Sequence, residues 1–215
     1  AHEINNPLNY IMGGYIGLSN ELKTYDFDKD KRISVFLEGI KTGIERASDI
    51  VKGLSQLSRD NDNYDEKCEI HSILDNCLTI LHYKYKNRIE VVKNYEKENL
   101  FTMGNTGKLH QVFINIISNA IDSIENNGVI YIDTISGDKN QEISIRDTGC
   151  GIPADNLNKI MDPFFTTKAP GKGTGLGLSI TNTIIQHHNG SIQFDSAPGY
   201  GTKVLIHLPK TYQNE

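Results

Sequence analysis

The chain has 215 residues, of which 37% are hydrophobic and 23% are charged, and its formal net charge is −5. Such a composition is typical of one or two globular domains, and the sequence contains no run of about 18 apolar residues that would span a membrane. Nucleic-acid binding is disfavoured, because 27 acidic side chains outnumber 22 basic ones. The three cysteines form no Cys-x-x-Cys pair, which argues against a disulfide framework or a zinc site and favours a reducing, cytoplasmic compartment.

Two helices are predicted at the start of the chain, because each segment has an apolar seam with helical steps of three and four residues. The first seam contains Leu8, Ile11, Tyr15, Leu18 and Leu22, and the second contains Ile33, Leu37, Ile40, Ile44, Ala47, Val51 and Leu54. A polar turn over 24–30 joins them, so we predict an antiparallel helical hairpin. The helical pattern already begins at Ala1, and we expect a longer protein whose upstream part carries any membrane anchor.

The hairpin is predicted to form a homodimer. Further apolar residues, such as Ile16, Phe36 and Ile50, flank the two seams, and a single hairpin cannot cover so wide an apolar stripe. Pairing two hairpins into a four-helix bundle would cover it. The alternative is that the hairpin packs against the remainder of its own chain.

A histidine at the start of the first helix is a candidate nucleophile. His2 and Asn6 share one face of the helix, and Pro7 removes the hydrogen bond to the carbonyl of Glu3. An imidazole with a pKa near ~6.5 offers a neutral nitrogen at pH 7, and Glu3 is placed to take or orient the ring proton. The alternative is an inert surface histidine, against which the glutamate, asparagine and proline at fixed offsets argue.

Mixed strands and helices follow a polar stretch, Ser58–Lys67, which we interpret as an interdomain linker. One helix is predicted to begin after Ser72 as its N-cap, and a second to cover 105–125. Strands are predicted over 68–70, 89–91, 100–102, 130–134, 143–147, 191–195 and 203–208. These elements predict an α/β sandwich, in which one sheet carries helices on one of its faces.

The predicted helix over 105–125 carries polar side chains on an otherwise apolar element. Asn115 and Asn119 lie on one face, and Asp122 follows a turn later. Oxygen ligands at this spacing suit a Mg²⁺ ion that keeps waters and shares phosphate oxygens. The alternative is that these are polar residues of an exposed helix face, or amides whose hydrogen bonds are satisfied locally.

Glycines dominate the stretch from Asp147 to Leu178. Gly149 and Gly151 follow Asp147 closely, and glycine recurs at every second position from 171 to 177, just before an apolar, helix-like segment. A glycine-rich turn that leads into a helix presents free N–H groups to an anion, which predicts a cradle for a nucleotide triphosphate. The order of residues is not that of a Walker P-loop. The alternative is a flexible surface loop.

Six motifs occur in order along the chain. They read His2-Glu3-x-x-Asn6-Pro7, Gln111-Val112-x-x-Asn115-x-x-x-Asn119-Ala120, Asp147-x-Gly149-x-Gly151, Asp162-Pro163-Phe164-Phe165, Gly173-Thr174-Gly175-Leu176-Gly177-Leu178 and Gly199-Tyr200-Gly201-Thr202. This order resembles the sensor histidine kinases of bacterial two-component systems, and most of all their nitrogen-regulator-like members. The resemblance implies an α+β architecture: a dimerisation and histidine-phosphotransfer hairpin over 1–62, then a catalytic ATP-binding α/β sandwich of the Bergerat type over 63–215.

The resemblance implies catalytic roles for three residues of the first helix. His2 matches the phosphoacceptor, and Glu3 matches its acid–base partner. Asn6 matches the position that aligns water for dephosphorylation of the partner. His188, near the end of a later helix, is expected to be structural.

The resemblance also implies a Mg-ATP site. Asn115 and Asn119 match the Mg²⁺-associated positions, Asp147 matches the carboxylate that accepts the adenine amino group, and Thr202 is expected to support Asp147. The other expected nucleotide contacts are Asp122, Gly149, Gly151, Ile152, Phe164 of the lid, Lys168, Lys172, Gly173, Thr174, Gly175, Leu176 and Gly177. The lid over 154–172 is expected to become ordered only with nucleotide.

The expected function is ATP-dependent autophosphorylation of His2, with ATP and Mg²⁺, followed by transfer to an aspartate of a response-regulator receiver domain. Phosphatase activity is a further expectation, and neither nucleic acid nor membrane contact is expected within this chain. Two alternatives are an ATPase similar to DNA gyrase or mismatch-repair enzymes and a non-catalytic ATP-binding module. Those ATPases use a glutamate at the position of Asn115, and an amide cannot act as a base, which favours phosphoryl transfer.

Overall fold

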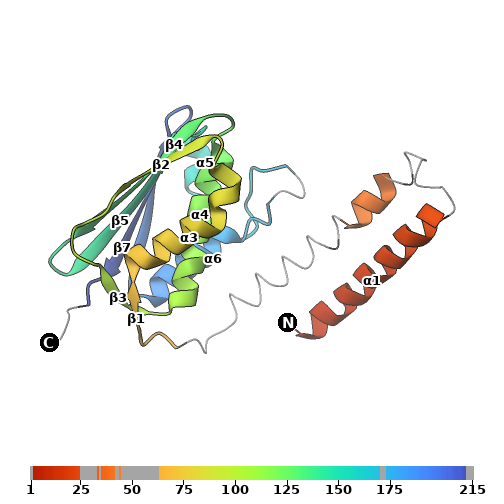
Figure 1. Ribbon diagram of the computed structural model, residues 1–215, viewed down its shortest axis with the longest axis horizontal. Coiled ribbons are helices and arrows are strands. Elements are labelled where there is room, and N and C mark those ends of the chain that lie inside the picture. The colour runs from red at the N-terminus through yellow and green to blue at the C-terminus, as the bar shows by residue number, and fades with distance from the viewer. Residues whose placement is uncertain are drawn as a thin grey trace. The chain divides into compact units, whose positions relative to one another are not determined.

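The computed structural model describes residues 2–24, 33, 35–41, 44, 63–169 and 173–211. The chain divides into two compact units, one of residues 1–59 with 164–176 and the other of residues 60–163 with 177–215. Figure 1 follows the chain from the N-terminal helix in red to the last strand in blue. The predicted domain boundary at residue 62 lies outside the described residues and stays a prediction.

The first unit contains the long helix α1 (His2–Thr24), which confirms the predicted first helix. Thr24, predicted as the first residue of the turn, is still in α1. Residues 33, 35–41 and 44 are also helical, while the rest of the predicted turn, 25–30, and the rest of the predicted second helix lie outside the described residues. Several apolar side chains of this unit are exposed, among them Ile11, Leu18 and Phe36. In the described part of the chain, no helix is both long and apolar enough to cross a membrane.

The second unit is built on a five-stranded sheet within the described residues. Its order is β2 (Ile89–Asn94), β4 (Gly128–Ser136), β5 (Asn140–Asp147), β7 (Gly201–Pro209) and β6 (Ser191–Ala197). Strands β2 and β4 are parallel and the other pairs are antiparallel. A separate antiparallel pair, β1 (Glu66–Glu69) with β3 (Phe101–Gly104), was not predicted as a second sheet.

Three helices cover one face of the five-stranded sheet, as Figure 1 shows: α3 (Ile70–Tyr85), α4 (Thr106–Ser123) and α6 (Gly177–His187). A short helix, α5 (Ala154–Leu157), follows β5. The core lies between these helices and the sheet, and it includes Ile73, Leu74, Leu109, Val112, Phe113, Ile117, Ile130, Ile132, Ile143, Ile145, Ile185 and Ile206. The predicted α/β sandwich with helices on one face is therefore confirmed.

Two predictions at the start of this unit are wrong. The predicted linker reached Lys67, but β1 already begins at Glu66. The predicted N-cap of the next helix was Ser72, but the cap is Glu69, whose carboxylate accepts from the Ser72 N–H at 3.1 Å. Strand β1 thus leads into α3 without a loop, because Glu69 has extended backbone angles and caps the helix at the same time.

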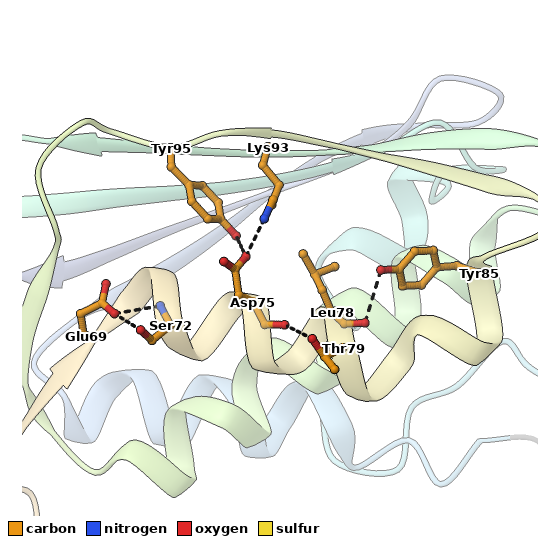
Figure 2. A network of polar contacts seen from close by, with 8 residues as sticks. All are labelled: Glu69, Ser72, Asp75, Leu78, Thr79, Tyr85, Lys93 and Tyr95. Carbon is orange, nitrogen blue, oxygen red and sulfur yellow. Dashed lines mark hydrogen bonds and ion pairs between the residues drawn. The ribbon is translucent and has the colours of Figure 1, made fainter.

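A polar network joins α3 to the edge strand β2 (Figure 2). Asp75 accepts hydrogen bonds from Lys93 Nζ at 2.9 Å and from Tyr95 Oη at 3.0 Å, both at Oδ1. Tyr85, at the end of α3, donates its hydroxyl to the carbonyl of Leu78. The two hydrogen bonds of Asp75 connect α3 to the edge of the sheet, whereas the bond of Tyr85 lies within α3.

Candidate nucleotide-binding site

A buried carboxylate stands at the end of β5. Asp147 is 4% exposed, and its Oδ1 accepts three hydrogen bonds: from Gly149 N at 2.8 Å, Ser123 Oγ at 2.9 Å and Thr202 N at 3.3 Å. The donors come from the loop after β5, from the last residue of α4 and from the start of β7. No hydrogen bond to Oδ2 is found among the described residues, so this oxygen is the acceptor left for a ligand.

Burial acts against the charge of Asp147 and raises its pKa above the ordinary value, while the hydrogen bonds from Gly149, Ser123 and Thr202 lower it. These opposing effects have physical causes that are easily separated: removal from water disfavours the carboxylate, and donors aimed at an oxygen favour it. The result is a desolvated acceptor whose protonation is sensitive to its few neighbours.

The loop after Asp147 fits tightly against the β6–β7 hairpin. Gly151 has φ +72°, and a Cβ there would lie 2.0 Å from the carbonyl oxygen of Ala197. Ile152 N donates to Ser196 Oγ at 2.8 Å, and Ser196 Oγ also contacts Thr202 Oγ1 at 2.9 Å. The predicted residues Ile152 and Thr202 therefore share one serine, and Gly151 packs against the neighbouring Ala197.

Helix α4 brings Asn115 close to the start of α6. Its amide Nδ2 donates to Thr181 Oγ1 at 2.8 Å, and a Cβ on Gly177 would lie 2.5 Å from Asn115 Oδ1. Asn119 is half-buried one turn further along the helix, and Asp122 is exposed. The predicted residues Asn115 and Gly177 are thus neighbours at the point where the glycine-rich turn enters α6.

The predicted lid and loop residues from 164 to 176 belong to the first unit. Within it, Phe164 has φ +69°, and Gly175, with φ +68°, approaches the Phe164 carbonyl so closely that a Cβ would lie 2.3 Å from its carbon. Thr174 Oγ1 accepts from Leu176 N at 3.4 Å, and a Cβ on Gly173 would lie 2.8 Å from Thr166 Oγ1. The loop therefore folds back on Phe164 and Thr166, in the second half of the predicted lid.

The remaining predicted site residues are the two lysines of the lid and three residues of the first helix. Lys168 is exposed, and Lys172 lies outside the described residues. His2, Glu3 and Asn6 are in the first turns of α1, but their side chains are outside the description, so their roles stay predictions.

His188 is structural, as predicted. It is 2% exposed, its Nδ1 donates to the Ile184 carbonyl at 2.7 Å, and its Nε2 accepts from Asn105 N at 3.0 Å. These two bonds fix the neutral tautomer with the proton on Nδ1. Asn105 also caps α4 through its side chain, so the imidazole joins the end of α6 to the beginning of α4. A Cβ on Gly104 would lie 2.1 Å from the His188 ring.

Sequence reasoning missed two hydroxyl residues, Ser123 and Ser196. Ser123 lies four residues after Asn119, so the helical spacing that selected Asn115 and Asn119 leads to Ser123 at the next turn. The prediction named Asp122, the neighbouring residue, and not Ser123. Ser196 has no such signal, since its contacts depend on the register in which it faces Thr202.

The described arrangement can recognise a ligand with a hydrogen-bond donor at its edge. The oxygen Oδ2 of the largely buried Asp147 provides the acceptor, and the adjacent glycine loop lets the backbone approach a flat group closely. No cluster of three or more His, Cys, Asp or Glu side chains that could hold a metal occurs among the described residues. A metal ion here would therefore depend on amide ligands and on oxygens of the ligand itself.

Comparisons with known proteins agree with this geometry. The family model of the histidine kinase-, DNA gyrase B-, and HSP90-like ATPases matches residues 104–212. The chain is 34% identical over 211 residues to the signal transduction histidine-protein kinase AtoS of Escherichia coli K12, and 34% identical over 212 residues to sporulation kinase A of Bacillus subtilis 168. The alignments cover 97% and 98% of this chain. The chain spans only 33% of the length of each of these two relatives.

Two solved structures of the histidine kinase ThkA are also similar. Its complex with the response regulator TrrA aligns with 98% of this chain and 60% of that chain, at 26% identity and a TM-score of 0.70. Its isolated catalytic domain aligns with 68% of this chain and 98% of that chain, at 30% identity and a TM-score of 0.62. The chain therefore belongs to the histidine kinase-, DNA gyrase B- and HSP90-like ATPase family, and within it to the sensor histidine kinases of two-component systems.

Proposed function

We propose that the protein is an ATP-dependent histidine kinase that phosphorylates itself on His2 and passes the phosphoryl group to an aspartate of a response regulator. The observation that carries the proposal is the buried Asp147 carboxylate, whose Oδ1 is fully occupied while Oδ2 is left to accept a donor. Similarity to histidine kinases over nearly the whole chain supports the same function.

In this proposal, Asp147 Oδ2 accepts the amino group of adenine. Gly149, Gly151 and Ile152 pass along the base, and Thr202 holds the carboxylate through its backbone N–H. The phosphates meet N–H and hydroxyl donors of the glycine-rich turn and of two lysines, while Phe164 anchors the lid. These phosphate-binding residues are Lys168, Lys172, Gly173, Thr174, Gly175, Leu176 and Gly177.

The donor set of α4 fits a magnesium ion. The hydrogen bond from Asn115 Nδ2 to Thr181 orients that amide, and no hydrogen bond to its Oδ1 is found among the described residues. Asn115 and Asn119 would hold the ion through their amide oxygens, and Asp122, at the exposed end of the same helix, contributes negative charge. When bound, the ion neutralises charge on the phosphate oxygens.

The chemical step is an in-line transfer. A neutral imidazole nitrogen of His2 attacks the γ-phosphorus, a P–N bond forms, and the bond from phosphorus to the β,γ-bridging oxygen breaks, so that ADP leaves. Glu3 takes or orients the proton on the other ring nitrogen. Asn6, on the same face of α1 as His2, aligns water when the phosphoryl group of the partner is hydrolysed. The alternative of simple ATP hydrolysis lacks a base at Asn115.

Two partners belong to the proposal. One is a second copy of the chain, supported by the apolar side chains of Ile11, Leu18 and Phe36, which are at least half exposed in the single chain. The other is a response-regulator receiver domain, and the relative ThkA has been solved in complex with its response regulator TrrA.

The proposal is tested by incubating the protein with Mg²⁺ and γ-labelled ATP. The expected result is an acid-labile, base-stable label on the protein, which is lost in His2→Ala and in Asp147→Asn. His82→Ala, which removes an exposed histidine of α3, is the matched control and keeps the label. Release of free phosphate without labelled protein would support the ATPase alternative, and labelling of His2→Ala would overturn the assignment of His2.

A further inference from the structure

We propose that Ser123 is a specificity-determining residue of the nucleotide site: its hydroxyl holds Asp147 Oδ1, so that Oδ2 faces the base as an acceptor that selects a 6-amino purine and rejects a 6-oxo purine. The inference rests on the proposed function, because it requires Asp147 to meet the base. Ser123 therefore acts through Asp147 and does not itself touch the ligand.

The geometry around Oδ1 carries the argument. Ser123 Oγ lies 2.9 Å from Oδ1, Gly149 N lies 2.8 Å from it and Thr202 N lies 3.3 Å from it. Two of these donors are backbone groups, which no substitution of their own side chains removes. Ser123 is the one side-chain donor to Asp147 among the described residues. A substitution at position 123 can therefore remove a hydrogen bond from the carboxylate.

The hydroxyl of Ser123 has one proton and two acceptors. Its Oγ lies 2.8 Å from the Ala120 carbonyl oxygen and 2.9 Å from Asp147 Oδ1. An ionised carboxylate is a stronger acceptor than a peptide carbonyl, so the proton points to Asp147 when Asp147 is charged. When Asp147 is protonated, the hydroxyl bonds to Ala120 instead at little cost. The serine therefore stabilises the charged form selectively.

The surroundings of Asp147 leave few other influences on its charge. Burial raises the pKa of Asp147, and the groups that lower it are the N–H groups of Gly149 and Thr202 and the hydroxyl of Ser123. These groups come from the loop after β5, from β7 and from α4, and the neighbouring β4 contributes the apolar Ile130 opposite Asp147. No charged side chain of the described residues perturbs this carboxyl.

The protonation state of Asp147 decides which base can bind. The amino group of adenine is a donor and needs a carboxylate oxygen that accepts. The 6-oxo group of hypoxanthine is a hydrogen-bond acceptor, which is repelled by a carboxylate but can accept a hydrogen bond from the O–H of a neutral carboxylic acid. A binding site built to pair with one group leaves a buried polar atom unpaired with the other. Preference for adenine should therefore fall as Asp147 becomes protonated, and Ser123 sets where this happens.

The test measures the Kd of ADP and of IDP from about pH 8 down to the lowest pH at which each protein stays folded, on the whole chain and its variants. These diphosphates carry no transferable γ-phosphate. In Ser123→Ala, we expect the Kd of ADP at pH 7.5 to rise about tenfold. We also expect the pH at which the preference for ADP over IDP falls by half to move upward, because the charged form of Asp147 loses a hydrogen-bond donor.

Two variants serve as controls. Ser118→Ala removes a hydroxyl from the same helix, where it accepts from Lys84, and should behave as the unmodified chain does. Ser123→Thr keeps the hydroxyl and should retain the original pH dependence. Where Ser123→Ala does not fold, Ser123→Cys provides a weaker donor of similar size, and a smaller upward movement of the same transition is expected.

The outcomes separate the inference from the proposed function. If the unmodified chain binds no ADP, or Asp147→Asn binds ADP as well as the unmodified chain does, the proposed site is wrong and the inference fails with it. If the site binds ADP but Ser123→Ala matches the unmodified chain, only the inference is overturned. It is also overturned if Ser123→Ala weakens ADP and IDP equally at every pH, because a merely structural role would have that effect.

Discussion

At the scale of single residues, Gln141 has an unusual environment. It is 0% exposed, and neither Nε2 nor Oε1 of its amide has a hydrogen-bond partner within the described part of the chain. A buried polar group without a partner destabilises the folded state. Gln141→Met removes both polar atoms and keeps the volume, so we expect the free energy of unfolding to rise by about 1 kcal/mol, measured by urea denaturation.

The matched control for this substitution is Gln193→Met, at an exposed position of β6, which should leave the stability unchanged. A loss of stability in Gln141→Met would contradict the prediction and would indicate that an ordered water satisfies the amide.

His188 makes stability depend on pH. Burial lowers the pKa of His188 below its ordinary value of 6.5, although the hydrogen bond that Nδ1 donates to the Ile184 carbonyl opposes this effect. The unfolded chain therefore binds a proton more readily than the folded one, and stability is lost as the pH falls through about 6.5 towards the lower folded pKa. In His188→Gln, the urea midpoint should vary less between pH 7.5 and about pH 5. An equal pH dependence in both proteins would contradict this assignment.

Sequence reasoning predicted the acceptor, Asp147, and one residue that supports it, Thr202, but missed the two serines beside them. Asp147, Gly149 and Gly151 were predicted, because their spacing along the sequence is distinctive. Ser123 and Ser196 were not, because a serine has many uses and these two gain theirs from a helix end and from a strand register. The motifs therefore predict the chemistry of the site, while the residues that tune it depend on the packing.

At the scale of elements, two turns require glycine for partly different reasons. Gly151 lies in the loop between β5 and α5, and Gly199 lies in the turn between β6 and β7. Gly151 and Gly199 have similar positive φ angles, +72° and +80°. A Cβ at Gly151 would also strike the Ala197 carbonyl, whereas nothing lies within 4 Å of one at Gly199. Gly199→Ala should therefore cost about 1 kcal/mol of stability through backbone strain alone.

Gly151→Ala should cost about 2 kcal/mol or more, because the clash adds to the strain. It should also weaken nucleotide binding, since relief of the clash requires the loop beside Asp147 to move away from β6. Urea denaturation and the Kd of ADP measure the two effects. Equal losses of stability in Gly151→Ala and Gly199→Ala would mean that the Ala197 carbonyl does not crowd a side chain at position 151.

The network of Figure 2 makes a second prediction at this scale. Asp75 and Lys93 are 49% and 44% exposed, so solvent screens their ion pair. Burial, followed by the hydrogen bond to Asp75, raises the pKa of Tyr95, so its hydroxyl stays a donor at all moderate pH values. Tyr95→Phe should cost about 1 kcal/mol of stability, and Asp75→Asn should cost less.

A double-mutant cycle measures this coupling. When Asp75 is already asparagine, Tyr95→Phe should cost less than it does in the unmodified chain. Tyr95→Phe keeps the ring stacked on His71, at 4.5 Å between centroids, so packing is preserved in both backgrounds. Additive losses would contradict a direct interaction.

Strands and helices of the second unit were predictable wherever their hydrophobic period was long and regular, as in α4 and β5. The errors fall where one residue serves two elements. Glu69 ends β1 and caps α3, so no loop residues mark the junction, and a pattern-based prediction placed the cap at Ser72. The pairing of β1 with β3 joins segments more than thirty residues apart, and local patterns do not contain such a pairing.

At the scale of the whole molecule, the exposed apolar residues of the first unit predict self-association. Leu18 is 51% exposed on α1, in the predicted seam. Leu18→Glu should shift the protein from dimer to monomer in sedimentation velocity at micromolar concentration, because two charges would be buried in the bundle. Ile80→Glu, at a 54% exposed position of α3, is the control and should leave the assembly unchanged.

An assembly that persists in Leu18→Glu but is lost in Ile80→Glu would place the interface on the second unit instead. The dimer was predicted from the width of the apolar stripe. Most of the second predicted helix lies outside the described residues, so its part in the dimer stays a prediction.

The imidazole that joins α6 to α4 has a consequence for how this chain can diverge. The ring of His188 occupies the space that any side chain at Gly104 would need. Homologous chains should therefore change the two positions together: a small residue at 188 opens room for alanine or serine at 104, and either change alone is selected against. A survey of paired substitutions would detect this covariation between sites that are 84 positions apart in sequence.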